Sequence, residues 1–174
     1  MTKKISAPFG PETVKSLHAG DRVLLSGKIW TGRDAAHKRL CTLLDEGKPL
    51  PVSLENELIY FVGPCPASPG KVIGSAGPTT SGRMDAYSPR LIDACHLAGM
   101  IGKGNRSAAV VEAMKRGPAV YFAATGGAGA LISKCIKKAD VSAFDDLGPE
   151  AIFRLEIEDL PLVVAIDCYG NSLY

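Results

Sequence analysis

The sequence predicts a mixed α/β fold in a single domain of residues 1–174. The length of 174 residues suits one domain that buries a core without a disulfide or metal staple. Short apolar runs with strand character alternate with helical patterns through the middle of the chain. Both ends are richer in strand patterns, which favours a mixed α/β domain over an all-β or a regular doubly wound one.

The first third of the chain gives the clearest strand. We expect residues 1–10 to form a polar leader and residues 11–18 a short helix. Residues 22–30 are rich in β-forming side chains and predict a strand, within which Gly27 indicates a bulge. Leucines at helical spacing then predict a helix over residues 35–44.

The middle third alternates between the two kinds of element. The apolar run at residues 58–62 predicts a buried strand, and residues 71–75 predict a second, shorter one. A helical pattern beginning at a Ser-Pro pair covers residues 88–96. A brief strand at residues 100–101 and an amphipathic helix over residues 106–115 follow.

The last third returns to strands. Residues 118–123 predict a strand, and a glycine-rich stretch leads into a helix over residues 130–136. Residues 141–144 and 151–157 are expected to be extended. The apolar run at residues 162–166 predicts the last buried strand.

Composition narrows the class of protein. The net charge is +2, charged residues are spread along the chain and aromatic residues make up only 6%, so a nucleic-acid-binding surface is not expected. No apolar run approaches the ~20 residues of a membrane span, and the N-terminus has no signal-peptide core. We therefore expect a cytoplasmic protein.

The five cysteines do not form a metal-binding pattern. They are far apart in sequence, and no two form a C-x-x-C pair: Cys41, Cys65, Cys95, Cys135 and Cys168. In a cytoplasmic chain we expect reduced and mostly buried thiols. Any iron–sulfur cluster that takes part in function would need ligands from another polypeptide.

The stretch SAGPTTSGRMD at residues 75–85 is the strongest candidate for a ligand site. Gly77-Pro78 predicts a turn, after which Thr79 and the two following hydroxyl residues stand where a helix begins. Free N–H groups at such a position favour a carboxylate or phosphate, and Arg83 can reach the same side. Ordinary capping by Thr or Ser, with Arg83 in solvent, explains the same residues.

Four polar residues share one placement, after a strand and beside glycine. They are Arg33, Thr79, Lys103 and Thr125. Ligands of open α/β sheets bind at the loops beyond the carboxyl ends of strands. Together with Arg83, these loops would place two guanidinium groups, an ammonium group and a hydroxyl in a common cleft that suits a small dicarboxylate. The alternative is that Arg33 and Lys103 are surface residues near turns.

Other motifs point to no separate chemistry. The Gly-Lys pair at Lys103 lacks the spacing of a phosphate-binding P-loop, and Ile132 stands where a dinucleotide fingerprint needs a small residue. Tight strand-to-helix packing better explains the glycines at 126–129. Asp34 and His37 lie one helical turn apart, so His37 is either an acid–base group or a structural histidine beside a capping Asp34.

Taken in order, these motifs resemble the β subunit of class I fumarases and L-tartrate dehydratases, a unit that also forms the C-terminal domain of single-chain class I fumarases. The matching stretches cover about residues 20–172. They are GRDAAHKR at 32–39, GPTTSGRMD at 77–85, GKG at 102–104, TGGAGA at 125–130 and IDCYGN at 166–171.

The resemblance implies a swivelling β/β/α domain and an iron–sulfur hydro-lyase. A [4Fe–4S] cluster would be bound by a partner α subunit and not by this chain, which would bind no metal itself. Arg33, Arg83 and Lys103 would hold the substrate carboxylates, and Thr79 would be the catalytic residue that moves the proton. The partner would cover an apolar or glycine-lined face near these residues, in a homodimer or an α2β2 assembly.

Three functions fit these expectations. The leading one is reversible hydration of fumarate to (S)-malate, active only with the partner subunit. L-tartrate dehydration is the close alternative, because its substrate differs by one hydroxyl. A dicarboxylate-binding module without catalysis is the third.

Overall fold

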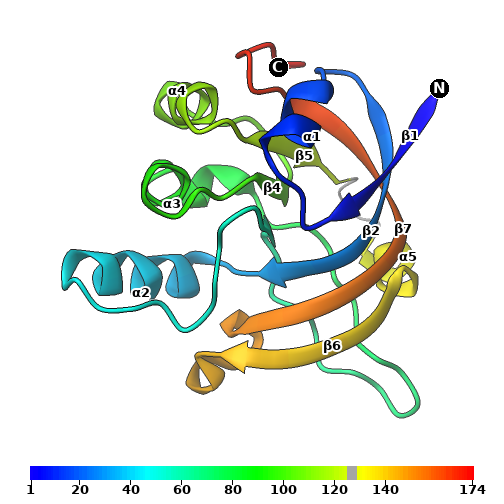
Figure 1. Ribbon diagram of the computed structural model, residues 1–174. Coiled ribbons are helices and arrows are strands. Elements are labelled where there is room, and N and C mark those ends of the chain that lie inside the picture. Colours follow the sequence, from blue (N-terminus) through cyan, green and yellow to red (C-terminus); the bar gives the residue numbers. More distant parts are fainter. Residues whose placement is uncertain (125–128) are drawn as a thin grey trace.

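The computed structural model describes residues 1–124 and 129–174, and within these residues the strands form one seven-stranded sheet (Figure 1). The spatial order is β1-β2-β3-β4-β5-β7-β6, and β2 also pairs with β7, so five strands close into a ring. The mixed α/β fold class is therefore confirmed. The strands are β1 Thr2–Ala7, β2 Arg22–Thr31, β3 Leu58–Tyr60, β4 Gly99–Gly102, β5 Val120–Ala123, β6 Ile136–Ala143 and β7 Ile152–Ile166.

Helices lie outside this ring. Three of them, α2, α3 and α4, lie next to one another on one side of the sheet (Figure 1). The α-helices are α1 Pro11–Ser16, α2 Asp34–Asp45, α3 Ser88–Cys95, α4 Ala108–Arg116 and α5 Gly129–Lys134. Two 3-10 helices, η1 Ser81–Met84 and η2 Asp145–Glu150, complete the elements of the described residues.

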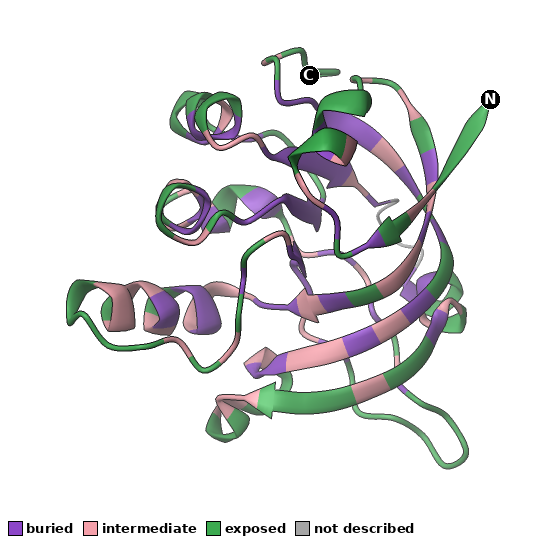
Figure 2. Cartoon of the chain, in the orientation of Figure 1, coloured by how far each residue is buried: buried purple, intermediate pink, exposed green. Residues whose placement is uncertain are grey.

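Side-chain alternation along the strands divides the core into two apolar clusters. On β3, Leu58 and Tyr60 belong to the cluster on the inner face of the ring, whereas Ile59 between them packs with helices α2–α4. Tyr121 of β5 likewise faces the helices and Phe122 the ring. Figure 2 shows the buried residues along the strands and on the sheet-facing sides of the helices. Full burial of each large apolar side chain contributes about 1.5–3 kcal/mol.

Strands β2 to β5 are parallel neighbours, so their carboxyl ends lie at the same edge of the sheet. Register pairs Trp30 with Ile59 between β2 and β3, and Leu58 with Gly99 between β3 and β4. β7 runs antiparallel to both β2 and β5 and thereby closes the ring. The expected bulge in β2 is confirmed, because its register with β7 shifts between Leu25 and Gly27.

Three expectations about elements were wrong. Residues 1–10 are not a polar leader, because Thr2–Ala7 forms β1 and pairs in parallel with β2. Residues 71–75 form no strand; Gly74 N instead donates to Cys65 O at 3.1 Å within the long loop after β3. The runs at 151–157 and 162–166 are one strand, β7, which continues through a positive φ of 49° at Asp159.

Candidate active site

The candidate site lies at the edge of the sheet where β2, β3 and β4 end. Arg33 follows β2 and stands at the N-cap position of α2, whereas Lys103 follows β4. The long loop after β3 carries Thr79 into η1, which contains Arg83. Since these strands are parallel neighbours, the loops that follow them lie at one edge of the sheet.

Backbone hydrogen bonds place Thr79 next to the Lys103 loop. Thr79 N donates to Phe61 O at 2.7 Å, which fixes the returning loop against the end of β3. Thr80 then forms a parallel bridge with Lys103, and Ser81 N donates to Lys103 O at 2.8 Å. Thr79 is half-buried and Lys103 is exposed. The hydroxyl and the ammonium group therefore come from adjoining backbone segments.

The turn after Thr79 is a 3-10 helix, Ser81–Met84, and not the start of the α-helix that the sequence suggested. Thr80 stands at its N-cap position without a side-chain cap bond. The α-helix α3 begins only at Ser88. Neither capping by a hydroxyl nor a long helix N-terminus therefore accounts for the hydroxyl cluster.

Arg83 is oriented by an ion pair with Asp34. Arg83 Nε and one terminal nitrogen each lie 2.9 Å from Asp34 Oδ2, and the Arg83 side chain remains 53% exposed. This pair joins η1 to the first residue of α2, so Asp34 does not act as the helix cap that the sequence suggested. Arg83 and Arg33 are thus brought to the same end of α2.

Arg33 combines a packed stem with an unpartnered nitrogen. Its side chain lies against Gly63, where an added Cβ would come 2.9 Å from Arg33 Cδ. Its Nε is buried and has no hydrogen-bond partner among the described residues. Gly63 thus leaves room for the guanidinium group, a contact that the sequence reasoning missed.

His37 is a buried structural histidine. Its Nδ1 lies 2.8 Å from Arg33 O, and because a carbonyl only accepts, the proton belongs on Nδ1. Burial lowers the pKa of His37 to about 4, against which the bond to Arg33 O acts only partly. The ring is therefore neutral near pH 7 and holds the backbone of Arg33. Of the two expectations for His37, the structural one is confirmed.

Gly129, the first residue of α5, packs against the loop that leads to Thr79. Ala76 N donates to Gly129 O at 3.3 Å, and a Cβ on Gly129 would come 2.8 Å from Gly77 N. Close packing at Gly129 is therefore confirmed. Thr125 and the rest of residues 125–128 lie outside the described residues.

Arg106 is a buried arginine that the sequence did not indicate, and it contacts Asp85 at the end of the segment that carries Thr79 and Arg83. Arg106 Nε lies 2.7 Å from Asp85 Oδ1, and the Arg106 side chain is fully buried. Its guanidinium carbon lies 5.1 Å from the Phe61 ring centre and 4.9 Å from that of Tyr121. Asp85 stands at the end of the GPTTSGRMD motif, but nothing in the sequence showed that its partner lies 21 residues away.

The described residues do not fit an iron–sulfur cluster. No three His, Cys, Asp or Glu side chains in residues 1–124 and 129–174 lie together as a metal site would require. The five cysteines are all free thiols. Within the same residues, no helix is both long and apolar enough to span a membrane.

The candidate residues lie on loops and turns at the edge of the sheet where the parallel strands end. A cavity of about 440 Å³ lies at the opposite edge of the sheet, near the start of β4 and β5, and is lined by residues that include Asp93, His96 and Arg116. The candidate site instead has three cationic residues and Thr79 on loops and turns at one edge of the sheet. Such a set can hold carboxylates by charge-assisted hydrogen bonds.

Comparison with known proteins gives a family match over nearly the whole chain. Residues 4–174 match the family model described as "Fumarase C-terminus". The chain is 39% identical over 166 residues to a Methanocaldococcus jannaschii protein named "Putative L(+)-tartrate dehydratase subunit beta", covering 92% of this chain and 85% of that one.

Longer relatives match over one part of their length. "Fumarate hydratase 2" of Leishmania major is 38% identical over 160 residues, which is 89% of this chain and 28% of that protein. "Fumarate hydratase class I, anaerobic" of Escherichia coli (strain K12) is 39% identical over 154 residues, 88% of this chain and 28% of that protein. This chain thus spans little more than a quarter of these fumarate hydratases.

Proposed function

Because this chain belongs to the fumarase C-terminus family, we propose that it is the substrate-binding part of a hydro-lyase that interconverts fumarate and (S)-malate. One observation carries the proposal. Arg33, Arg83 and Lys103 occupy loops at one sheet edge, and backbone bonds join the Lys103 loop directly to the segment that carries Thr79. Three cations and a hydroxyl at one edge of the sheet suit a dicarboxylate whose proton is moved beside a carboxylate.

The three cations have the task of binding and orienting the substrate. Arg33, Arg83 and Lys103 hold the two carboxylates, each charge-assisted bond contributing about 1.5–3 kcal/mol. Among the described residues Arg33 Nε has no hydrogen-bond partner, and a carboxylate acceptor would satisfy this donor. Asp34 keeps Arg83 at the site through their 2.9 Å contact.

Thr79 has the task of moving the proton. In dehydration of malate, the C–H bond next to one carboxylate breaks and its proton passes to the Thr79 oxygen as an alkoxide. The C–O bond at the neighbouring carbon then breaks, the hydroxyl leaves as hydroxide that takes up a proton to become water, and the double bond of fumarate forms. A threonine alkoxide is very unfavourable in water, and the nearby Arg83 and Lys103 lower its cost. The same charges stabilise the aci-carboxylate that forms when the proton leaves.

A partner polypeptide completes the enzyme in this proposal. A [4Fe–4S] cluster would supply Lewis-acid chemistry at the substrate hydroxyl, with all its ligands on that partner. The open edge at Arg33 and Lys103 is the face that the partner would cover. Support comes from the relative named as a subunit beta, whose length this chain nearly matches. The chain would act as one domain in the cytoplasm, in a homodimer or an α2β2 assembly.

Tartrate dehydration is the second candidate. A relative named for L(+)-tartrate dehydratase is 39% identical and is covered to 85% of its length. The same cations and the same Thr79 serve either substrate, because both are dicarboxylates with a proton next to a carboxylate.

The proposal is tested by replacing one threonine at a time with alanine in the assembled enzyme. Thr79→Ala should lower kcat for malate at least about a thousandfold, since the proton loses its acceptor. Thr80→Ala is the matched control, because Thr80 is exposed and bridges Lys103 through its backbone. We expect it to retain activity within about threefold. Near-normal turnover by Thr79→Ala would contradict the assignment.

A further inference from the structure

Two loops of the candidate site are joined beneath their exposed side chains. Ser81 is fully buried, and its N–H donates to Lys103 O at 2.8 Å. A Cβ on Gly102 would overlap Ser81 Oγ, so the Ser81 side chain rests directly on the backbone before Lys103. The segment with Thr79 and Arg83 is thus in contact with the Lys103 loop.

The tyrosine Tyr121, on β5, adds a directed chain of hydrogen bonds to this contact. Its hydroxyl lies 2.7 Å from Gly104 O, and since a carbonyl only accepts, Tyr121 must donate. Ser81 Oγ lies 2.7 Å from the same hydroxyl, so Ser81 must be the donor in that pair. Burial raises the pKa of Tyr121, which keeps the hydroxyl protonated. The chain therefore runs from Ser81 through Tyr121 to Gly104.

The chain of hydrogen bonds ends at Gly104, the residue directly after Lys103. Lys103 stands between two glycines, which have no Cβ and therefore allow this segment many backbone conformations when it is not held. Gly104 has a φ of +87°. Gly104 is exposed, and its carbonyl is held by the buried Tyr121 hydroxyl. Loss of that one bond would free the turn directly after Lys103.

We propose that Tyr121 is a positioning residue whose hydroxyl fixes Lys103 relative to Thr79 and Arg83. It contacts no substrate and acts through the backbone of Gly104 and the side chain of Ser81. The inference rests on the proposed function for its catalytic consequence, whereas the geometric part stands on the hydrogen bonds alone.

Tyr121→Phe is a clean variant for this test. It removes one oxygen and keeps the ring, whose centre lies 4.9 Å from the Arg106 guanidinium carbon. Tyr169→Phe is the matched control, because Tyr169 also donates from its hydroxyl to a backbone carbonyl, Lys15 O, at 2.8 Å, but outside the site. Ser81→Ala serves as a second variant that breaks the same chain at its other end.

Hydrogen exchange tests the geometry without any assumption about activity. In Tyr121→Phe, the Ser81 amide and the amides of residues 103–106 should exchange at least about tenfold faster than in the wild type. Tyr169→Phe should leave these amides unchanged. Equal exchange in Tyr121→Phe and the wild type would overturn the inference.

Steady-state kinetics of the assembled enzyme test the consequence. Partial unfolding lowers apparent kcat but leaves KM unchanged, whereas a displaced Lys103 raises KM. We expect Tyr121→Phe and Ser81→Ala each to raise KM for malate about tenfold, and the double variant to raise it no further. Unchanged KM, or effects that multiply in the double variant, would overturn the inference. A wild-type enzyme inactive on every dicarboxylate would instead refute the proposed function, and exchange would still decide the positioning.

Discussion

The burial of His37 makes the free energy of unfolding depend on pH. Its ring lies 5.3 Å from Phe61 and 6.1 Å from Tyr87, measured between ring centroids, and its Nε2 has no partner among the described residues. A proton on Nε2 would thus place a charge at a buried atom that has no hydrogen-bond partner among the described residues. This is the physical reason for a folded-state pKa of about 4, below the ordinary 6.5.

Stability should therefore fall with acid in a way that depends on His37. Between pH 6.5 and 4 the unfolded chain binds a proton at this residue that the folded chain does not, so the free energy of unfolding decreases as pH falls. The loss amounts to about 3 kcal/mol and is absent above pH 7. His37→Gln removes this contribution. Urea titrations at pH 4 and 7 should show the stability advantage of the wild type over the variant shrinking by that amount, and a constant difference would contradict the account.

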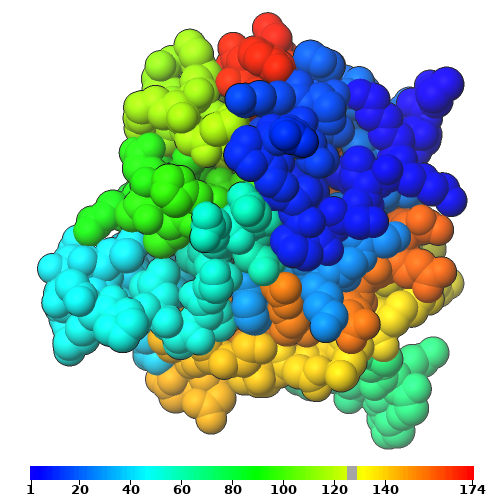
Figure 3. All heavy atoms as spheres, in the orientation of Figure 1, coloured from blue at the N-terminus to red at the C-terminus, as the bar shows by residue number. Residues whose placement is uncertain are grey.

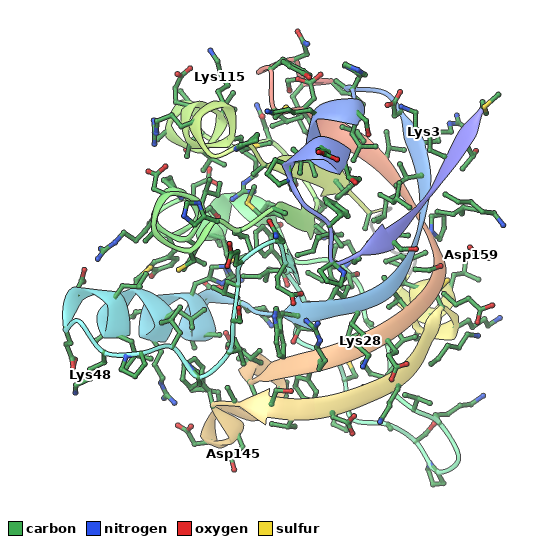
Figure 4. The ribbon with its side chains drawn as sticks, in the orientation of Figure 1. Lys3, Lys28, Lys48, Lys115, Asp145 and Asp159 are labelled. Atoms are coloured by element: carbon green, nitrogen blue, oxygen red, sulfur yellow. The ribbon has the colours of Figure 1, made fainter. Side chains whose placement is uncertain are left out.

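Lys103 provides a second test at a single residue. Lys103→Met removes one charge-assisted hydrogen bond to the substrate and should lower kcat/KM for malate by about 10- to 100-fold. Lys48→Met is the control, because Lys48 pairs with Glu46 at 2.8 Å and lies beyond the far end of α2 (Figure 4). We expect the control to stay within twofold of the wild type. Full activity of Lys103→Met would remove this residue from the site.

Among the elements, β1 depends on a close approach to β2. Gly27 has a φ of +111°, and a Cβ there would overlap Ala7 O at the end of β1. The glycine therefore allows both the bulge in β2 and the pairing of the first strand.

Gly27→Ala should destabilise the fold by at least about 2 kcal/mol, since it combines backbone strain with a steric overlap. Gly70→Ala separates the two effects, because Gly70 also has a positive φ, +79°, but has no atom within 4 Å of an added Cβ. We expect the control to lose only about 1 kcal/mol. Thermal unfolding measures both variants, and equal losses would show that the contact with β1 is not the cause.

Elements with strong apolar patterns could be predicted from the sequence, and those defined by pairing could not. The alternating run of β2 and the leucines of α2 gave these elements within a few residues of their bounds. β1 was missed because most of its residues are exposed and only its backbone bonds to β2 define it. β7 was divided in two because Asp159-Leu160-Pro161 looks like a break, whereas Pro161 in fact pairs with Leu24.

The sequence indicated that the candidate residues stand at strand ends, but it did not indicate the contacts that hold them there. Glycines beside Arg33, Thr79 and Lys103 indicated strand-end loops, and these residues do lie at one sheet edge. The supporting contacts join residues far apart in sequence, Arg83 with Asp34 49 residues away and Ser81 with Tyr121 40 residues away. No local pattern carries such contacts, because only the folded topology creates them. The functional roles of the four residues stay predictions.

At the scale of the whole molecule, the strands form a closed ring that carries the candidate site at one edge. β2 and β7 pair along most of their length and thereby close this ring. The long loop after β3 projects from this body around residue 70 (Figure 3). The loop returns to the sheet at Thr79, whose N–H donates to Phe61 O directly after β3.

The most direct test of the whole account is turnover by the chain together with an iron–sulfur partner. The two polypeptides are co-expressed without oxygen, and dehydration of (S)-malate and of L-tartrate is measured in parallel. The account predicts turnover of malate by the pair and by neither chain alone. Turnover of tartrate alone would keep the residue roles and change the substrate. Malate or tartrate binding by the isolated chain, with no complex and no turnover, would contradict the account and favour a binding module.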